Sequence, residues 1–201
     1  MSNQFTEMGP GSAGATPVSI ADPGPLGLAG FAMTTFMLSL VNNGVIHGAG
    51  AVDFVPLALA YGGGAQLLAG MWEFRKGNTF GATAFSSYGA FWIAVFIQAK
   101  FFPTGIAYNG WSYFLLAWTI FTFYMLIASM RTSGAVFAVF LALTVTFAIL
   151  CAGSFNGSAY TTEAGGNVGI VTAIFAWYAS FAVVTNSTFK KTVIPVFPLS
   201  K

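Results

Sequence analysis

Long runs of apolar residues, separated by short polar or glycine-rich stretches, cover this chain from about residue 26 to residue 188. Each run has close to the roughly 20 residues that an α-helix needs to cross about 30 Å of hydrocarbon. The predicted spans are Leu26–Val45, Phe54–Trp72, Ala82–Phe102, Gly110–Met130, Gly134–Gly153 and Val168–Thr188. The pattern therefore predicts an all-α integral membrane protein with six transmembrane helices.

The composition of the 201 residues agrees with this pattern. Hydrophobic residues make up 56% of the chain and charged residues only 6%, whereas a soluble protein carries about 25% charged residues. Lipid must therefore be the main solvent of the folded chain. Cys151 is the only cysteine and His47 the only histidine, so we expect no intrachain disulfide, no metal site and no cofactor.

The two ends of the chain differ from the apolar region. Residues 1–21 are rich in Gly, Ser, Thr and Pro and lack the basic segment and apolar core of a signal peptide, which indicates a disordered tail. We interpret residues 22–190 as the six-helix transmembrane domain and residues 191–201 as a short C-terminal tail. No stretch is long enough for a separate soluble domain.

The basic residues predict the orientation of the chain in the membrane. With six spans, six of the seven Lys and Arg residues fall on the side of both termini, and only Lys100 falls on the other. The six are Arg75, Lys76, Arg131, Lys190, Lys191 and Lys201. The positive-inside rule then places both termini in the cytoplasm, and we expect a multi-pass protein of the plasma membrane.

Several polar residues interrupt the apolar runs, where a polar group without a partner is costly. Thr34 and Thr35 lie in the first predicted span and Gln66 in the second. A Ser or Thr hydroxyl in a helix often bonds the carbonyl one turn back, which is a purely structural role. Gln66 needs several partners, which a neighbouring helix would also supply. Glu73, beside two basic residues, is either an interfacial carboxylate held by those bases or a proton-handling group at a pore mouth.

Every Lys and Arg lies at the end of a span or in a loop. A pathway for anions in this chain would therefore use no buried full positive charge. Helix N-termini, backbone N–H groups and neutral side chains are the remaining devices that attract an anion. Such weak sites suit conduction, because a tightly bound anion would not leave.

A resemblance to a known family rests on a series of ordered motifs. Asp22-Pro-Gly-Pro-Leu-Gly-Leu28 closely resembles the Asn-Pro-Ala-Pro-Leu-Gly-Leu signature of the acetate uptake transporter family, also called the succinate–acetate permeases. The match continues through Gly30–Thr35, Tyr61–Gln66 and Lys76–Gly81, and more loosely through Leu143–Val145 and Lys191–Pro195. It covers nearly the whole membrane region and is strongest from about residue 22 to residue 92.

This resemblance implies a homo-hexameric ring of six-helix subunits with one pathway through each subunit. It further implies transport of acetate and related short carboxylates, with succinate as a second candidate, by proton symport or by channel-like passage. We expect neither a nucleic-acid partner nor enzyme activity, because a membrane enzyme would need a nucleophile–base pair or a metal cluster. The alternative that stays open is a structural or adaptor membrane protein without transport activity.

The resemblance also implies the residues of the pathway. The family has a narrow hydrophobic constriction made by a phenylalanine, a tyrosine and a leucine, which correspond to Phe31, Tyr88 and Leu143. With cytoplasmic termini, the three residues lie roughly 9–14 Å along their helices from the same membrane face, so they can form one ring. We expect this ring to pass the methyl group of acetate while the hydroxyl of Tyr88 donates to the carboxylate oxygens.

Further residues fall in matching motifs. The expected residues of the pathway wall are Thr34, Thr35, Gln66 and Ala176, and the residues expected at a mouth or in proton handling are Glu73 and Asp22. Ala176 aligns with a family position at which a small side chain sets the width. Asp22 departs from the family signature, which has Asn. An ionised Asp22 near the path would repel acetate, so it either turns away as a helix cap or is protonatable.

Overall fold

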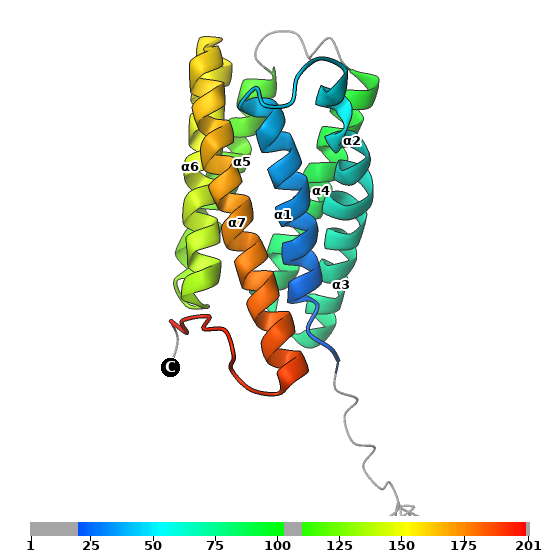
Figure 1. The fold of residues 1–201 in the computed structure, drawn as a ribbon, viewed down its shortest axis with the longest axis vertical. Helices are drawn as coiled ribbons and strands as arrows, with labels where there is room; N and C mark the ends of the chain where they lie inside the picture. Colours follow the sequence, from blue (N-terminus) through cyan, green and yellow to red (C-terminus); the bar gives the residue numbers. More distant parts are fainter. Residues whose placement is uncertain (1–19, 103–109, 200–201) are drawn as a thin grey trace, which may run out of the picture.

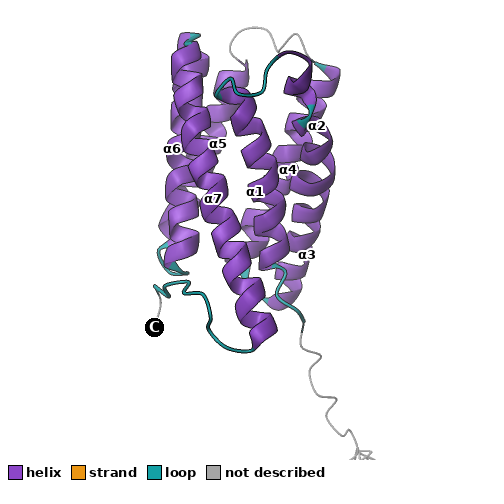
Figure 2. Cartoon of the chain, in the orientation of Figure 1, coloured by secondary structure: helices purple, strands orange, loops and turns teal. Residues whose placement is uncertain are grey.

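The computed structural model describes residues 20–102 and 110–199. Within these ranges, six helical segments are long and apolar enough to cross a membrane, and they stand side by side in an elongated bundle (Figure 1). Helices make up most of the described chain, and loops and turns lie between them and after α7 (Figure 2). The all-α fold with six spans is therefore confirmed. Residues 1–19, nearly all of the predicted disordered tail, lie outside the described residues.

The second span is assembled from several short helical segments. The full order is α1 (Gly24–Asn42), the 3-10 helix η1 (Gly48–Val52), α2 (Phe54–Leu57), the π-helix η2 (Ala58–Ala65), α3 (Gln66–Lys76), α4 (Thr79–Phe101), α5 (Gly110–Ser129), α6 (Gly134–Asn156) and α7 (Ala159–Phe189). The segments from η1 to α3 together form the span Gly48–Lys76. A π-helix is rare, and it is frequently found at functional sites.

Polar side chains begin three of the long helices. Asn78, Ser133 and Ser158 each accept a hydrogen bond from a backbone N–H three residues further on, which caps α4, α6 and α7. The cap at Ser158 starts α7 nine residues before the predicted span at Val168. The first turns of α7 carry Thr161, Thr162 and Glu163, and such polar residues conceal a helix from a search for apolar runs.

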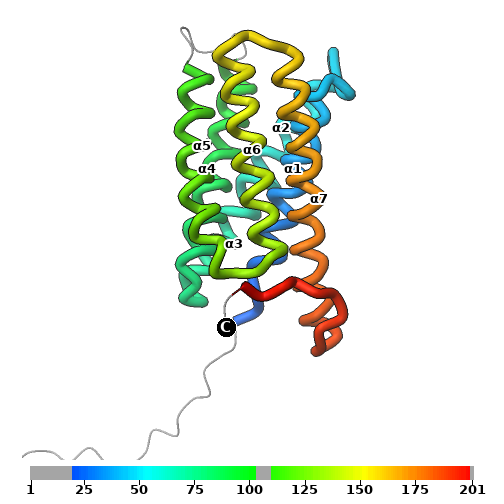
Figure 3. Tube along the Cα trace, turned by 90° about the vertical axis from the view of Figure 1, so that its left-hand side faces the viewer, coloured from blue at the N-terminus to red at the C-terminus, as the bar shows by residue number. Residues whose placement is uncertain are grey.

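The bundle is closely packed because small residues let helix backbones approach one another. α7 lies against both α1 and α6, α5 lies against α6, and α3 lies against α4. Gly166 shows how close the approach of α7 to α1 is, because a Cβ atom there would lie 2.6 Å from the backbone nitrogen of Asn43. Figure 3 shows the same arrangement from the side, with α5 and α6 in front.

Three helices that contribute to the interior run in the same direction. We call the end of the bundle where α1 begins and α7 ends the proximal end, and the opposite end the distal end. α1, α4 and α6 all run from the proximal to the distal end, and α3, α5 and α7 run back (Figure 1). Residues at similar positions in α1, α4 and α6 therefore lie at similar depths in the bundle.

Candidate functional site

Three cavities follow one another through the interior of the bundle. The distal cavity has a volume of about 370 Å³, the middle one about 20 Å³ and the proximal one about 180 Å³. Phe31 and Leu143 line both the distal and the middle cavity. Leu28, Ala84, Phe85 and Phe140 line both the middle and the proximal cavity. The interior of the bundle thus contains a line of cavities that narrows sharply at its middle.

The narrow point lies where α1, α4 and α6 present large apolar side chains to one another. Phe31, Tyr88 and Leu143, the three residues expected to form the constriction, all line the middle cavity. The ring centroids of Phe31 and Tyr88 are 5.8 Å apart, a separation typical of aromatic pairs in contact. A cavity of about 20 Å³ has room for about one water molecule. The structure brings the three residues together, and their role in selection stays a prediction.

Phe140 is a member of this constriction that the sequence analysis missed. Its ring centroid lies 6.1 Å from that of Tyr88, and its side chain lines both the middle and the proximal cavity. Phe140 precedes Leu143 by three residues in α6 and therefore lies on the same helix face. Helical spacing from Leu143 was the signal that could have found it.

The hydroxyl of Tyr88 differs from the expectation. It lies 2.9 Å from Oγ1 of Thr122 in α5, and the hydroxyl of Thr122 donates to the carbonyl of Trp118 at 2.7 Å. A threonine hydroxyl has one proton, so Tyr88 is the donor and Thr122 the acceptor. The proton that was expected to meet a carboxylate is thus already used to join α4 to α5. Tyr88 presents its ring, and not its hydroxyl proton, to the narrow point.

Gln66 lies at the same depth, directly after the π-helix. Its side chain is 1% exposed, lines the middle cavity, and its Oε1 has no hydrogen-bond partner in the described protein. A π-helix has more residues per turn than an α-helix, which alters the direction in which the following side chains point. Gln66 therefore adds a polar group to a constriction that is otherwise lined by apolar and aromatic side chains.

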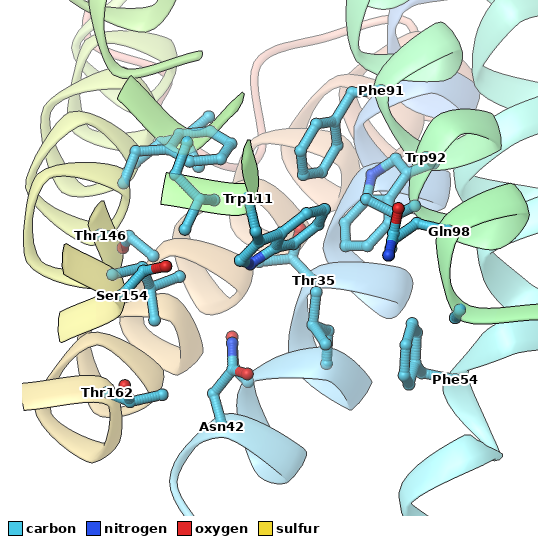
Figure 4. Close-up of a pocket in the computed structure, with 18 of the residues that line it drawn as sticks. Thr35, Asn42, Phe54, Phe91, Trp92, Gln98, Trp111, Thr146, Ser154 and Thr162 are labelled. Carbon is cyan, nitrogen blue, oxygen red and sulfur yellow. The ribbon is translucent and has the colours of Figure 1, made fainter. Parts of the chain in front are cut away.

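The distal cavity is the widest of the three, and aromatic and aliphatic side chains make up most of its lining (Figure 4). Phe91, Trp92 and Trp111 from α4 and α5 face Thr35 and Asn42 from α1 across it. Among the described residues that line it, none is Asp, Glu, Lys or Arg. Any attraction that this cavity exerts on a solute therefore comes from neutral groups.

The proximal cavity contains the charged groups of the site. Asp22 Oδ1 lies 2.9 Å from Nζ of Lys76 and accepts a hydrogen bond of 2.9 Å from the backbone N–H of Gly24, at the start of α1. Glu73 is 1% exposed, and its Oε2 has no hydrogen-bond partner in the described ranges. All three side chains line the cavity. Asp22 is both bonded at the helix start and paired with a cation, so its negative charge at this mouth is largely compensated.

The remaining residues expected in the pathway wall occupy different places. Thr35 lines the distal cavity. Thr34 is buried, donates its hydroxyl to the carbonyl of Gly30 at 2.9 Å and packs where a side chain on Gly62 of η2 would otherwise lie. Ala176 is buried in α7. Neither Thr34 nor Ala176 is among the described residues that line the three cavities.

The bond between Tyr88 and Thr122 predicts a measurable coupling. We expect Thr122→Val to lower the free energy of unfolding by about 1–3 kcal/mol, because it leaves a buried hydroxyl without an acceptor. Tyr88→Phe removes the hydroxyl itself and should cost only about 0.5–1.5 kcal/mol. Unfolding of the purified protein in mixed micelles measures both changes in free energy. The double variant Thr122→Val/Tyr88→Phe completes a double-mutant cycle, which gives the coupling energy between the two residues.

Thr119→Val is the matched control for that cycle. Thr119 also donates to a carbonyl of α5, that of Leu115 at 2.7 Å, so its replacement removes the same kind of bond within the same helix. It should show no coupling to Tyr88→Phe. A coupling energy near zero between Tyr88 and Thr122 would contradict the assignment of the hydroxyl.

Comparison with known proteins places this arrangement among transporters. The chain is 40% identical over 201 residues to acetate permease A of Emericella nidulans, in an alignment that covers 90% of this chain and 67% of that protein. It is 38% identical over 183 residues to the succinate-acetate/proton symporter SatP of Escherichia coli strain K12, in an alignment that covers 88% of this chain and 95% of that protein. It is 38% identical over 202 residues to the ammonia transport outward protein 2 of Saccharomyces cerevisiae, in an alignment that covers 96% of this chain and 71% of that protein.

The fold is also found among solved structures. The structure of the bacterial acetate channel SatP superimposes with a TM-score of 0.82 at 36% sequence identity, over 89% of this chain and 99% of that one. The model of the GPR1/FUN34/yaaH family matches residues 5–201, which is nearly the whole chain. This chain therefore belongs to the GPR1/FUN34/yaaH family.

Proposed function

We propose that this protein transports acetate and related short carboxylates across a membrane, and that the line of cavities in each subunit is the pathway. The observation that carries the proposal is the meeting of Phe31, Tyr88 and Leu143 at the narrowest point of that line. The names of the relatives, an acetate permease, a succinate-acetate/proton symporter and an acetate channel, support the same substrate class. Their names also agree with a transport role rather than an enzymatic one.

The physical chemistry of the constriction suits such a substrate. Acetate combines one methyl group with one carboxylate, and an apolar ring accommodates the methyl group without cost. A larger or fully hydrated ion would have to lose water against aromatic and aliphatic side chains, with few polar groups to replace it. Selection by width, with weak neutral groups on either side, would favour small monocarboxylates.

The proposal includes an assembly and an orientation. Large apolar side chains such as Leu68, Ile120, Phe123 and Phe181 are exposed on the outside of the isolated subunit, as expected for surfaces that face lipid or a neighbouring copy. A homo-hexameric ring in the plasma membrane, with the proximal end and both termini in the cytoplasm, accords with these surfaces and with the positive-inside rule. Each subunit would then conduct through its own pathway.

Uptake of radiolabelled acetate into liposomes that contain the purified protein tests the transport function directly. Faster uptake than into protein-free liposomes is expected, and it should fall when unlabelled acetate is added as a competitor. Uptake no faster than into protein-free liposomes, with a folded protein, would reject transport and leave a structural or adaptor role as the better explanation.

Glu73 is the residue that we propose for proton handling. It is buried and lines the proximal cavity, as do Asp22 and Lys76 of the ion pair. Its Oε2 has no hydrogen-bond partner in the described protein, and a buried carboxyl group with such an oxygen is suited to carry a proton. If transport is coupled to protons, an imposed pH gradient should accelerate acetate uptake by the wild type, and Glu73→Gln should abolish most of that acceleration. An unchanged response to the gradient in the variant would remove Glu73 from the coupling.

The constriction should set the size of the transported carboxylate. We expect Leu143→Ala to raise the uptake of butyrate relative to acetate by roughly tenfold, because contacts with one or two methylene groups in an apolar site discriminate by about this factor. Leu141→Ala is the matched control, since Leu141 is in the same helix but is 46% exposed on its outside. The same butyrate-to-acetate ratio in wild type and Leu143→Ala would refute a selective role for Leu143.

A further inference from the structure

The last described segment of the chain, residues 191–199, lies across the proximal end of the bundle, and we call it the strap. It begins where α7 ends and runs back to the start of α6 (Figure 3). Leu199 donates its backbone N–H to the carbonyl of Thr132 at 3.0 Å, and Pro198 pairs with Ser133 in an antiparallel β-bridge. The strap thus connects the end of one helix of the pathway domain to the start of another.

The strap supplies acceptors for backbone groups that α6 cannot satisfy by itself. The first N–H groups of an α-helix have no acceptor within the helix. The N–H of Gly134 donates to the carbonyl of Phe197 at 2.6 Å, and the N–H of Ala135 donates to that of Val196 at 3.2 Å. Two backbone hydrogen bonds therefore hold the first turn of α6 to the strap.

Side chains of α7 hold the other half of the strap. Oδ1 of Asn186 accepts the N–H groups of Val193 and Ile194 at 2.7 and 2.9 Å, and its Nδ2 donates to the carbonyl of Ile194 at 2.8 Å. The hydroxyl of Tyr178, about two turns earlier in α7, donates to the carbonyl of Pro195 at 2.6 Å. The strap is thus anchored to α7 at one end and to α6 at the other.

The strap buries little of its own surface. Ile194 and Val196 are half-buried, and the other residues of the strap are exposed. Phe197 has a φ of 55°, a left-handed conformation that is unfavourable for a bulky side chain. A segment with few buried apolar contacts opens at a low cost in free energy. Both features favour detachment of the strap while the six helices stay folded.

The first turn of α6 forms part of the wall of the proximal cavity. Thr132, just before α6, and Val136 in its first turn both line that cavity, as does Phe140 one turn further on. The rest of the lining comes from the starts of α1 and α4, from α3 and from Val183 of α7. A movement at the start of α6 therefore changes the width of the proximal cavity before it reaches Leu143 at the constriction.

We propose that the strap is a latch on the proximal mouth of the pathway. While it is seated, it holds the first turn of α6 beside the proximal cavity and keeps that cavity narrow. When it detaches, the first turn of α6 moves outward and the cavity opens to the proximal side. The effect on passage rests on the proposed transport function, whereas the movement of α6 does not.

Two substitutions release the strap at its two ends without shortening the chain. A Cβ atom at Gly134 would lie 2.9 Å from Cβ of Phe197 and 3.3 Å from its carbonyl oxygen, so Gly134→Ala displaces the strap although alanine itself favours the helix. Asn186→Ala removes three hydrogen bonds at the α7 end. Asn167→Ala is the matched control, because Asn167 lies in the same helix and bonds Asn43 instead of the strap.

The accessibility of the proximal cavity to a thiol reagent tests the movement of α6. Cys151 is the only cysteine, so Cys151→Ala gives a background without thiols, and Val136→Cys then places one reporter thiol in the proximal cavity. The rate of its reaction with a charged methanethiosulfonate is measured on the full chain in detergent micelles. Ser154→Cys, in the distal cavity, is the control reporter.

Gly134→Ala and Asn186→Ala are each expected to raise the labelling rate at the proximal reporter roughly tenfold or more, because a minor open state is about 0.1–10% populated before the latch is broken. Asn167→Ala should leave this rate unchanged, and none of the variants should alter labelling at the distal reporter. In liposomes, the two release variants should raise acetate uptake roughly twofold or more, as expected when the opening of a gate limits the rate.

Size-exclusion elution and thermal melting confirm that each variant is folded, and Tyr178→Phe replaces a release variant that is not. Wild-type labelling in both release variants, or an increase confined to one of them, would overturn the latch. An equal increase at the distal reporter would also overturn it, since the whole bundle would then be loosened.

Uptake of acetate separates the latch from the transport function. Faster labelling with unchanged uptake, in a protein that transports acetate, would overturn the strap as a control on passage. Faster labelling in a protein that does not transport acetate would support the movement of α6 and reject the proposed function.

Discussion

The rest of this structure depends on the requirement that polar groups in hydrocarbon find their partners inside the protein. The backbone N–H and C=O groups bond one another within the helices, and seven threonine hydroxyls donate to the carbonyl one turn back. Five buried side-chain atoms of the described residues escape this rule. Four of them belong to Thr35, Trp92, Gln66 and Glu73, which line the distal, middle and proximal cavities. The exceptions thus follow the line of cavities through the bundle, and the fifth, Ser86 Oγ, is the one that this line does not explain.

Close packing and openness coexist because they use different residues. Glycines bring α1 and α7 into backbone contact on one side of α1, whereas Phe31 and Thr35 on another side of the same helix face open space. The aromatic residues of α4, α5 and α6 support the walls by edge-to-face contacts, such as those of Phe91 with Trp118 and Phe147. A rigid wall of this kind keeps a narrow point narrow, which width-based selection requires.

The sequence was sufficient for the features that depend on single-helix patterns. Apolar run lengths predicted six spans, and the motifs around Phe31 and Tyr88 led to the residues that meet at the narrow point. It was insufficient where the outcome depends on a neighbouring helix. The hydroxyl of Tyr88 points to Thr122 in α5, and nothing in either segment alone indicates this partner. The start of α7 was missed because its first turns are polar, and the unpaired donor of Trp92 becomes visible only once its surroundings are known.

The line of cavities runs through the helices of a single chain. This has a consequence for cells that carry one mutant and one normal allele of the gene. Passage would require no residue from a neighbouring subunit, whatever the number of copies that assemble. A copy with a blocked constriction would remove only its own share of the flux and leave the adjacent copies working. Defects in this pathway should therefore behave as recessive alleles, whereas in the proposed ring a change that disrupts a surface between copies would also harm the neighbouring copies.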